Sequence, residues 1–384
     1  MSSAKTYDVV VVGAGVFGAW TALALAQRGK RVALLEAYGP GHSRSSSGDE
    51  SRIIRMGYGA DEIYTRWSAR SLHLWKELFA AARDESLFQE TGVLWLAEAG
   101  NASLEAARGV LTRCGVKFTE LDRAALIEKY PQINFAGIEG GIYEPESGVL
   151  MARRSVAAVV TTAQRVGVEY KTAQALAPEG SGEISQVETS GGETFAARQF
   201  VFACGAWLGK VFPEVLGERI FPTRQEVYYI GVPAGDERFS PSALPTFLFK
   251  PDESYGMPNL DGRGLKIALD RHGERVDPDT QSRIVTALEL ERIQKYVAYR
   301  FPALKDAPIV ETRVCQYENT SSGDFLVDRH PGMPNVWLVG GGSGHGFKHG
   351  PAMGEYVAGQ LSVARGEPRF SLESKLSVQK RTVY

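Results

Sequence analysis

The first forty residues alternate between two hydrophobic patterns. Residues 8–12 are Asp followed by four valines, and a short β-branched run of this kind predicts a strand buried in a parallel sheet. Residues 19–28 are rich in Ala and Leu and predict a helix that Gly29 ends, while residues 31–35 predict a second strand. This order of strand, helix and strand predicts a βαβ unit at the start of a doubly wound α/β domain.

Both helices and short strands are predicted further along the chain. Helices are expected at residues 61–82, 153–166, 280–301 and 350–361, with helical segments and loops from 102 to 130. Strands are expected at residues 92–96, 200–207, 255–258, 264–268 and 335–339, and the alternation in 225–232 predicts an antiparallel strand of a second domain. In the 61–82 helix, Trp67 and Trp75 share an apolar face, which indicates core packing rather than cofactor contact.

Length and charge narrow the class of protein. The chain has 384 residues, which exceeds the roughly 250–300 at which a single hydrophobic core stops growing, so two domains are expected. The net charge is −2 and no long run of like charges occurs, which argues against a nucleic-acid partner. No apolar run approaches the roughly 18 residues that span a bilayer, so no membrane association is expected.

The three cysteines are Cys114, Cys204 and Cys315, and their wide spacing fits neither a disulfide framework nor a metal site. Cys114 and Cys204 are interpreted as packing residues, with Cys204 inside the 200–207 strand. Neither a signal-peptide pattern at the N-terminus nor a peroxisomal Ser-Lys-Leu address at residues 381–384 is found. We therefore expect a cytoplasmic protein without a metal.

A glycine motif follows the first predicted strand. Gly13 allows a tight turn, Gly15 lets the backbone approach a pyrophosphate, and Gly18 lets the helix pack on the sheet. The same turn contains Val16 and Phe17, and the helix that begins there offers N–H groups to phosphates. Glu36 lies 18 residues after Gly18, followed by Ala37, where an acid would accept hydrogen bonds from ribose hydroxyls. The motif predicts a dinucleotide site, but a glycine-rich βαβ unit without a ligand remains the alternative, and the motif does not separate NAD from FAD.

Two later segments contain side chains that could take part in binding or catalysis. Residues 45–55 read Ser-Ser-Ser-Gly-Asp-Glu-Ser-Arg-Ile-Ile-Arg, and Arg52 and Arg55 would share one face if this segment were helical. The two isoleucines between them indicate partial burial, and buried arginines need anionic partners. Near the C-terminus, Cys-Gln-Tyr at 315–317 is followed by Gly-Gly-Gly-Ser-Gly-His-Gly-Phe-Lys at 340–348.

These segments, together with residues 144–150, resemble the monomeric sarcosine oxidase and N-methyl amino acid oxidase family, which belongs to the FAD-dependent amine oxidoreductases of the D-amino acid oxidase superfamily. The resemblance spans residues 8 to about 365, and it is most specific at the two ends. It implies that Ser51 and Arg52 lie next to the flavin, with Arg52 over its ring, and that Arg55 holds the substrate carboxylate, since a guanidinium can bind both oxygens.

The resemblance also implies roles for residues of the second domain. Lys266 would lie beside the flavin and activate oxygen, because a fixed cation stabilises developing negative charge. Tyr255 and Tyr317 would line the substrate pocket. Asp270 stands where sarcosine oxidases carry a histidine, and we expect it to bind a hydroxyl or a second amine of the substrate. Glu318 replaces a common Thr of the family, a change expected to affect selectivity.

In the C-terminal motif, the resemblance implies a covalent bond from Cys315 to the flavin 8α-methyl group. Gly344 and Phe347 would contact the flavin, and Lys348 would contact both the flavin and the substrate carboxylate. His345 is interpreted either as a catalytic or as a loop-shaping residue. The 350–361 helix would direct its N-terminus at the flavin pyrimidine and stabilise the reduced anion.

The implied fold is a doubly wound, Rossmann-like FAD-binding domain with an inserted α+β substrate domain on a mixed or antiparallel sheet. The expected limits are 1–90, 145–220 and 315–384 for the FAD-binding domain, and 91–144 and 221–314 for the substrate domain.

The implied activity is a monomeric FAD-dependent oxidase of an N-substituted amino acid: sarcosine or a related N-methyl, cyclic or glycated amino acid. A hydride would pass to flavin N5, the imine would hydrolyse, and O2 would be reduced to H2O2. A flavin dehydrogenase with another acceptor, or a non-catalytic FAD-binding subunit of a larger complex, are the alternatives. An NAD-dependent dehydrogenase would leave residues 315–348 without a role.

Overall fold

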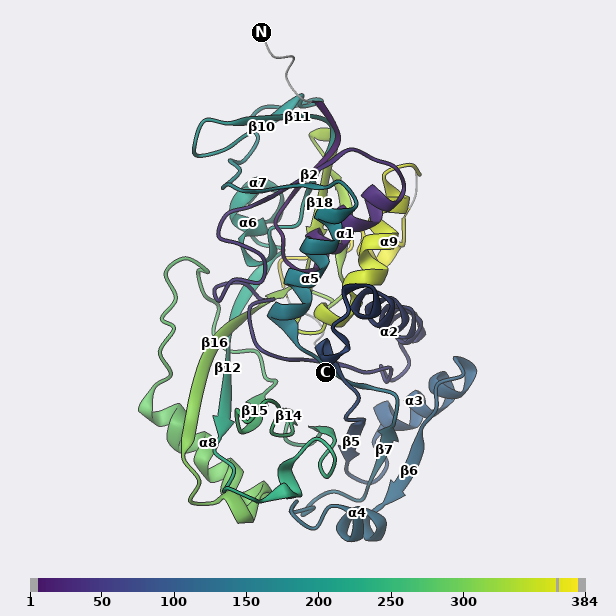
Figure 1. Cartoon of the computed structure of the whole chain (residues 1–384), viewed down its shortest axis with the longest axis vertical. Coiled ribbons are helices and arrows are strands. Elements are labelled where there is room, and N and C mark those ends of the chain that lie inside the picture. Colours follow the sequence, from purple (N-terminus) through teal and green to yellow (C-terminus); the bar gives the residue numbers. More distant parts are fainter. Residues whose placement is uncertain (1–5, 364–365, 379–384) are drawn as a thin grey trace.

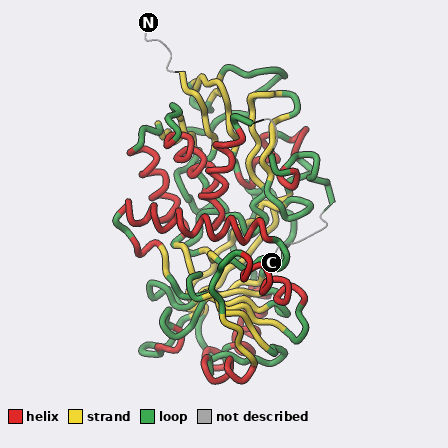
Figure 2. The backbone as a smooth tube through the Cα atoms, turned by 90° about the vertical axis from the view of Figure 1, so that its right-hand side faces the viewer, coloured by secondary structure: helices red, strands yellow, loops and turns green. Residues whose placement is uncertain are grey.

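Two large β-sheets, one in each half of an elongated molecule, organise the chain (Figure 1). The computed structural model describes residues 6–363 and 366–378. The C-terminal tetrapeptide 381–384, considered above for a peroxisomal address, lies outside the described residues. Helices predominate in one half and strands in the other when the molecule is viewed from the side (Figure 2).

The first sheet has seven strands, with β17–β18–β11–β1–β2–β9 in this order and β10 paired to β11. Its strands are β1 (Thr6–Val12), β2 (Val32–Glu36), β9 (Glu169–Thr172), β10 (Gln186–Glu188), β11 (Thr194–Phe202), β17 (Leu326–His330) and β18 (Met333–Gly340). The ladders that join β18, β11, β1, β2 and β9 are parallel. The valines of β1 are buried on both faces, which explains the continuous apolar run of this strand.

Helices cover one face of this sheet. Val9 and Val11 of β1 join the core formed by α1 (Val16–Gln27), α2 (Glu62–Ala82), α5 (Ala152–Arg165) and α9 (Gly350–Gln360). Helix α1 packs against both α5 and α9. Val10 and Val12 point to the opposite face, where the short helices α6 (Leu208–Val211) and α7 (Pro213–Leu216) cover them. The predicted doubly wound arrangement is therefore present.

The second sheet has eight strands, in the order β16–β12–β15–β14–β13–β5–β7–β6. Its strands are β5 (Val93–Ala97), β6 (Thr119–Asp122), β7 (Gly140–Glu144), β12 (Phe221–Ile230), β13 (Thr246–Phe249), β14 (Ser254–Met257), β15 (Leu265–Leu269) and β16 (Ile309–Asn319). Only the β13–β5 ladder is parallel among these pairs, so the sheet is mixed as predicted. Strands β12 and β16 are long and extend from this sheet toward the first half (Figure 1).

The segment with the two arginines is not helical. Residues Arg52–Ile54 form β3, which pairs with β8 (Gly148–Leu150), and β8 also pairs with β4 (Phe88–Gln89). Side chains three apart on a strand point to opposite faces, but Arg55 lies just beyond β3 and turns with the chain. Both arginines therefore line the same cavity, although the segment forms a strand and not the helix considered from the sequence.

One helix begins later than predicted, and one region expected to contain helices and loops also contains a strand. The helix expected at 280–301 begins only at Ala287 as α8 (Ala287–Arg300), because Thr286 adopts an extended conformation and its hydroxyl accepts a hydrogen bond from the Glu289 N–H at 3.3 Å. Between 102 and 130 the chain forms α3 (Ala102–Arg113) and α4 (Arg123–Lys129), and the strand β6 separates them.

Cys204 is not part of a strand. Strand β11 ends at Phe202, and Cys204 lies in the turn that follows, where its thiol donates to the Val12 carbonyl at 3.8 Å. The expected strand position of Cys204 was therefore wrong, whereas its side chain packs against the core of this sheet as predicted and also lines the large cavity described below. The domain limits expected from the sequence stay a prediction, and β16 runs without interruption through the limit at residue 315.

The close packing of α1 on α9 generates a stability prediction. A Cβ atom at Gly354 of α9 would lie 2.5 Å from the Trp20 carbonyl oxygen of α1, so Gly354→Ala must separate the two helices. We expect it to lower the free energy of unfolding by about 1–3 kcal/mol in urea titrations. Gly359→Ala in the same helix is the control, since its Cβ would meet only the end of the Arg28 side chain at 3.7 Å. The control should raise the same free energy by up to about 1 kcal/mol, and equal effects would contradict the packing argument.

Candidate active site

A cavity of about 260 Å³ opens at the turn between β1 and α1. Gly13 has φ +100°, and a Cβ atom there would lie 2.4 Å from the Ala203 carbonyl oxygen. A Cβ atom at Gly18 would lie 1.9 Å from the Gly13 carbonyl oxygen, so this glycine lets α1 pack against the turn. Gly15 faces the cavity and would meet only the Ser47 hydroxyl at 3.5 Å. Gly13 and Gly18 thus have the close backbone approaches that the motif predicted, and the approach of Gly15 to a pyrophosphate stays a prediction.

Glu36 closes the far side of this turn. Its carboxylate accepts hydrogen bonds from the Ala14 N–H at 2.8 Å and from the Tyr38 N–H at 3.0 Å. The His42 ring lies 3.7 Å from the same carboxylate, and burial lowers the pKa of His42. An acid fixed at the end of β2, directly beside a phosphate-sized turn, suits the ribose of a dinucleotide.

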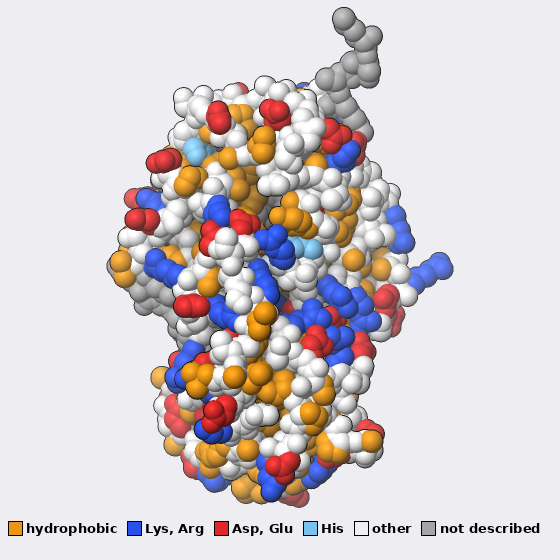
Figure 3. Space-filling view, turned by 90° about the vertical axis from the view of Figure 1, so that its left-hand side faces the viewer, with side chains coloured by type: hydrophobic (Ala, Val, Ile, Leu, Met, Phe, Trp, Pro, Cys, Tyr) orange, Lys and Arg blue, Asp and Glu red, His pale blue; other side chains and the backbone are white. Residues whose placement is uncertain are grey.

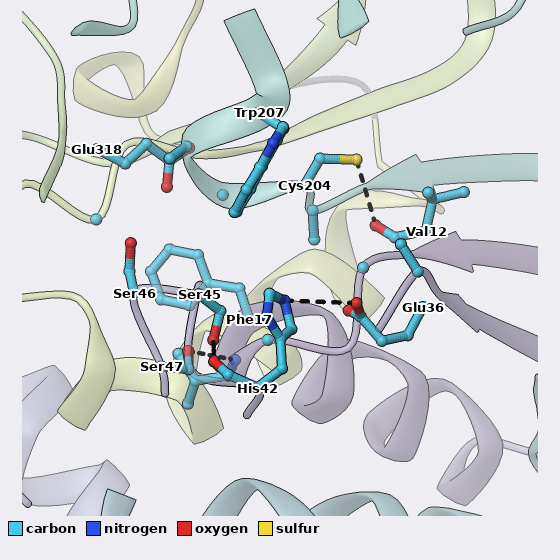
Figure 4. Close-up of a pocket in the computed structure, with 18 of the residues that line it drawn as sticks. Val12, Phe17, Glu36, His42, Ser45, Ser46, Ser47, Cys204, Trp207 and Glu318 are labelled. Atoms are coloured by element: carbon cyan, nitrogen blue, oxygen red, sulfur yellow. Dashed lines mark hydrogen bonds and ion pairs between the residues drawn. The ribbon is translucent and has the colours of Figure 1, made fainter. Parts of the chain in front are cut away.

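The rest of the cavity suits an extended cofactor. Val16, Phe17 and Ala37 line it as predicted, and Ser47, Cys204, Trp207 and Glu318 line it in addition. Figure 4 shows Glu36 and His42 at one end and Glu318 with Ser46 toward the other. The N-terminus of α1 opens onto the cavity between them, where N–H groups would face a pyrophosphate. These residues fit a dinucleotide such as FAD.

A second cavity of about 60 Å³ adjoins the first. Arg52, Tyr317, Gly344 and Phe347 line both cavities. The smaller cavity adds Arg55, Tyr255, Asp270, Cys315, His345 and Lys348 from the predicted site, together with apolar side chains such as Leu248 and Met257. A ring placed at the shared wall would therefore have the dinucleotide turn on one side and the charged cavity on the other.

Aromatic rings and backbone hold Arg55 in the smaller cavity. Its guanidinium lies over the rings of Tyr58 and Trp95, at 4.3 and 4.4 Å from their centroids, and it donates to the Gly57 carbonyl. Buried Glu144 fixes this loop by accepting from the Met56 and Gly57 N–H groups at 2.7 and 2.9 Å and from the Trp95 indole at 2.8 Å.

Lys348 lies beside Arg55 and is also buried. Its ammonium donates to the Tyr58 hydroxyl at 2.9 Å and to the His345 carbonyl at 3.0 Å. The Tyr58 hydroxyl also contacts the His349 ring at 2.8 Å and the His345 ring at 3.2 Å. Burial, and then the nearby charge of Arg55, lower the pKa of Lys348 well below its ordinary value. An anionic ligand would reverse this effect, which suits a site for a carboxylate.

One acid faces these cations across the small cavity. The Tyr317 hydroxyl donates to Asp270 at 2.8 Å, and burial raises the pKa of Asp270 above its ordinary value. Tyr317 lies beneath Gly344, where an added Cβ atom would come within 2.8 Å of the tyrosine ring. Tyr255 lines the same wall from β14.

Behind the small cavity, Asp49 binds two of the predicted cations. It accepts from Lys266 at 2.6 Å and from Arg52 at 2.5 Å, and Tyr229 donates to it at 3.2 Å. Burial alone would raise the pKa of Asp49, but the charges of Lys266 and Arg52 outweigh burial and hold it well below the usual range. Lys266 also donates to the Ser51 carbonyl at 2.9 Å and lines neither cavity.

Cys315 and Arg52 meet at the junction of the cavities. The Arg52 guanidinium donates to the Cys315 sulfur at 3.5 Å, and the Cys315 side chain is buried in β16. The structure therefore gathers the predicted residues around one pair of cavities, apart from Gly18, Ser51 and Lys266, which support its walls. Sequence reasoning missed Asp49, Tyr58 and Glu144, although Asp49 stands in the 45–55 segment and Glu144 in the 144–150 segment.

Among the described residues, no group of three or more His, Cys, Asp or Glu side chains is placed to hold a metal ion. Within the same part of the chain, no helix is long and apolar enough to cross a membrane. On the face shown in Figure 3, Lys and Arg side chains gather at the level where the two halves of the molecule meet.

Comparison with known proteins places this site in a family. The family model described as FAD dependent oxidoreductase matches residues 8–360. Monomeric sarcosine oxidase of Streptomyces avermitilis is 31% identical over 360 residues, covering 92% of this chain and 93% of the relative. Human peroxisomal sarcosine oxidase is 30% identical over 91% of each chain. N-methyl-L-tryptophan oxidase of Citrobacter koseri is 27% identical over 95% of this chain and 97% of the relative.

Solved structures share the fold. L-proline dehydrogenase from P. horikoshii has a TM-score of 0.79 at 22% identity and covers 94% of each chain. Glycine oxidase from Geobacillus kaustophilus has a TM-score of 0.77 at 23% identity, covering 96% of this chain and 98% of the other. The predicted family resemblance, the fold class and an FAD-dependent oxidoreductase are confirmed by these comparisons.

The contacts of Asp49 generate a prediction about stability. Asp49→Asn removes the charge that binds Lys266 and Arg52 and should lower the free energy of unfolding by about 3–5 kcal/mol in urea at pH 7. Because the folded-state pKa of Asp49 is depressed, its contribution is present at neutral pH and is lost only in acid.

Asp261→Asn is the matched control, because Asp261 pairs with Arg154 at 2.9 Å on the surface. This control should change the same free energy by less than about 1 kcal/mol. An Asp49→Asn protein as stable as the control would show that the buried contacts contribute little.

Proposed function

Because the chain belongs to the FAD-dependent oxidoreductase family, we propose that it is an oxidase of a small N-substituted amino acid that uses FAD. The observation that carries the proposal is the buried pair Arg55 and Lys348 in a small cavity next to the cofactor cavity. We also propose that the protein works as a monomer, as the name monomeric sarcosine oxidase says of a relative, and that it is cytoplasmic.

Arg55 and Lys348 are proposed to bind the substrate carboxylate. Both are 4% exposed, and both lie against Tyr58. Within the described residues, no carboxylate forms an ion pair with either cation, and two such buried cations favour an anionic ligand, because it recovers part of their lost hydration energy. The planar guanidinium can bind two carboxylate oxygens, and the lysine supplies a further donor.

The volume of the small cavity limits the size of the substrate. A volume of about 60 Å³ accommodates only a few water molecules, which favours N-methyl and cyclic amino acids over glycated ones. Asp270 is proposed to accept a hydrogen bond from an amino or hydroxyl group of the substrate. Tyr317 keeps one of its oxygens in place, and Tyr255 contributes to the wall of the substrate site.

Bound FAD would supply the oxidising chemistry, taking a hydride from the carbon next to the substrate nitrogen and passing the electrons to oxygen. The residues of this chain orient the amine with its lone pair free and exclude water, and the resulting imine is hydrolysed. Cys315 is proposed to hold the flavin covalently, since its sulfur lies in the wall of the small cavity. Gly344, Phe347 and Arg52 are proposed to contact the flavin, because they line both cavities. His345 is proposed to shape the loop, because its carbonyl accepts from Lys348.

Lys266 is proposed to promote the reaction with oxygen. It is 1% exposed, and its ammonium is held in one position by Asp49 and Ser51. A cation that needs no reorganisation stabilises an anion formed from oxygen better than solvent does. Arg52 lies beside the same Asp49 carboxylate, so the charge behind the flavin site is fixed.

An anaerobic titration of the purified protein tests the proposed function. Sarcosine, N-methyl-L-tryptophan, L-pipecolate and a glycated amino acid would be added in turn while the flavin absorption band is followed. We expect bleaching by a small member of the panel, and peroxide on admission of air. N-methylethylamine, which lacks the carboxylate, should not bleach the band. Lys348→Met should raise the substrate concentration needed to bleach the band by roughly tenfold or more.

Three outcomes would contradict the proposal. Equal bleaching of the flavin by N-methylethylamine would show that the substrate needs no carboxylate. Bleaching by an amine without oxygen uptake by the reduced protein would indicate a dehydrogenase. A yellow protein that no amine bleaches would point to a non-catalytic FAD-binding subunit.

The role of Lys266 predicts a difference between the two half-reactions. Lys266→Met should slow reoxidation by oxygen by roughly 10²-fold while changing flavin reduction much less, as measured by stopped-flow absorbance. Lys266→Gln serves as the second variant, because its amide can still donate to Asp49 but has no charge. Equal slowing of both half-reactions in Lys266→Gln would rule out a specific role in the oxygen reaction.

A further inference from the structure

Glu318 is a buried acid inside the cofactor cavity. It lies in β16 next to Tyr317, its side chain lines the larger cavity, and it does not line the small one. The residue is 6% exposed. The expectation that Glu318 affects substrate selectivity therefore does not follow from its position, because its side chain faces the cofactor.

One oxygen of Glu318 lacks a partner. Its Oε1 atom is buried and has no hydrogen-bond partner within residues 6–363 and 366–378. The carboxyl group lies against Gly340, where an added Cβ atom would come within 2.3 Å of Oε1. A buried carboxyl oxygen without a partner disfavours the ionised form of Glu318, because no N–H or O–H group of the described residues compensates the charge on that oxygen.

The position of Glu318 indicates which part of the cofactor it meets. Figure 4 shows Glu36, expected at the ribose, at one end of the cavity, and Glu318 at the other end, facing Ser46. Tyr317, the preceding residue, lies at the shared wall of the two cavities. The flavin has to reach that wall to meet a substrate, so the carboxyl group lies at the flavin end.

We propose that Glu318 contacts the flavin part of bound FAD and tunes its reduction potential. The inference rests on the FAD-dependent family alone and does not require the amine substrate. Reduction adds negative charge to the flavin, which an ionised carboxylate opposes and a neutral carboxyl group does not. The protonation state of Glu318 therefore sets how readily the cofactor is reduced.

The surroundings of Glu318 make this protonation accessible near neutral pH. Burial raises the pKa of Glu318 to about 7, partly offset by the N–H groups of Gly341 and Gly342. The other titratable groups of the cavity are Cys204, Tyr317, Arg52, Glu36, His42, Tyr38 and Asp279. The pKa values of Cys204, Tyr317 and Arg52 lie above their ordinary values, and that of His42 lies below, so these four do not change charge between pH 7 and 8.5.

The test compares the holoenzyme with Glu318→Gln, which keeps the size and polarity of the side chain but cannot ionise. Midpoint potentials are measured without substrate, by equilibrium with reference dyes, from pH 5.5 to 8.5. We expect the two proteins to agree near pH 5.5. Above pH 7 the variant should have the more positive potential. Glu218→Gln, an exposed residue before β12, controls for net charge and should follow the wild type.

Two results would overturn the proposal. A potential difference that does not change with pH, or no difference at all, would show that the Glu318 charge does not reach the flavin. If Glu318→Gln does not bind FAD, the proposal is tested on the wild type alone. The midpoint potential of the wild type should fall more steeply with pH just above pH 7 than below pH 6. A single straight line of potential against pH would refute the proposal.

Discussion

The buried carboxylate of Asp49 joins the parts of the molecule that the site requires. It accepts from Lys266 on β15, from Arg52 on β3, and from Tyr229 on β12. Two of these strands belong to the second sheet, while Asp49 follows the loop that leaves the first sheet. One acid thereby fixes two cations at the boundary of the halves, and their charge is balanced before any substrate arrives.

The other two cations are held differently, and the difference has a consequence for binding. Arg55 rests on two aromatic rings and a carbonyl, and Lys348 rests on a hydroxyl and a carbonyl. Neutral partners position these groups without cancelling their charge, so an incoming carboxylate still gains most of the electrostatic attraction. Glu144 helps to position Arg55 indirectly, because it accepts hydrogen bonds from the N–H groups of the loop that follows Arg55.

The features that could be predicted from the sequence are those set by residues close together in the chain. The glycine turn, Glu36 and the α1 helix have local spacing, and their placement agrees with the structure because a βαβ unit leaves little choice. Resemblance to a family extended this to residues such as Arg55 and Lys348, which lie 293 positions apart. Asp49 and Tyr58 were missed because their importance comes from partners on distant strands, and no periodicity marks them. The 52–55 segment was misread because two arginines three apart suggest a helix, whereas pairing with β8 selects a strand.

Strand β16 shows how a single segment can serve both cavities. Side chains alternate along a strand, so Cys315 faces the small cavity while Gln316 and Glu318 face the large one. Tyr317 is large enough to reach the wall between them and lines both. A substitution at Glu318 therefore acts from the large cavity, whereas one at Cys315 acts at the wall of the small cavity, where its sulfur is proposed to hold the flavin. Consecutive residues of one strand thus reach the cofactor from two different cavities.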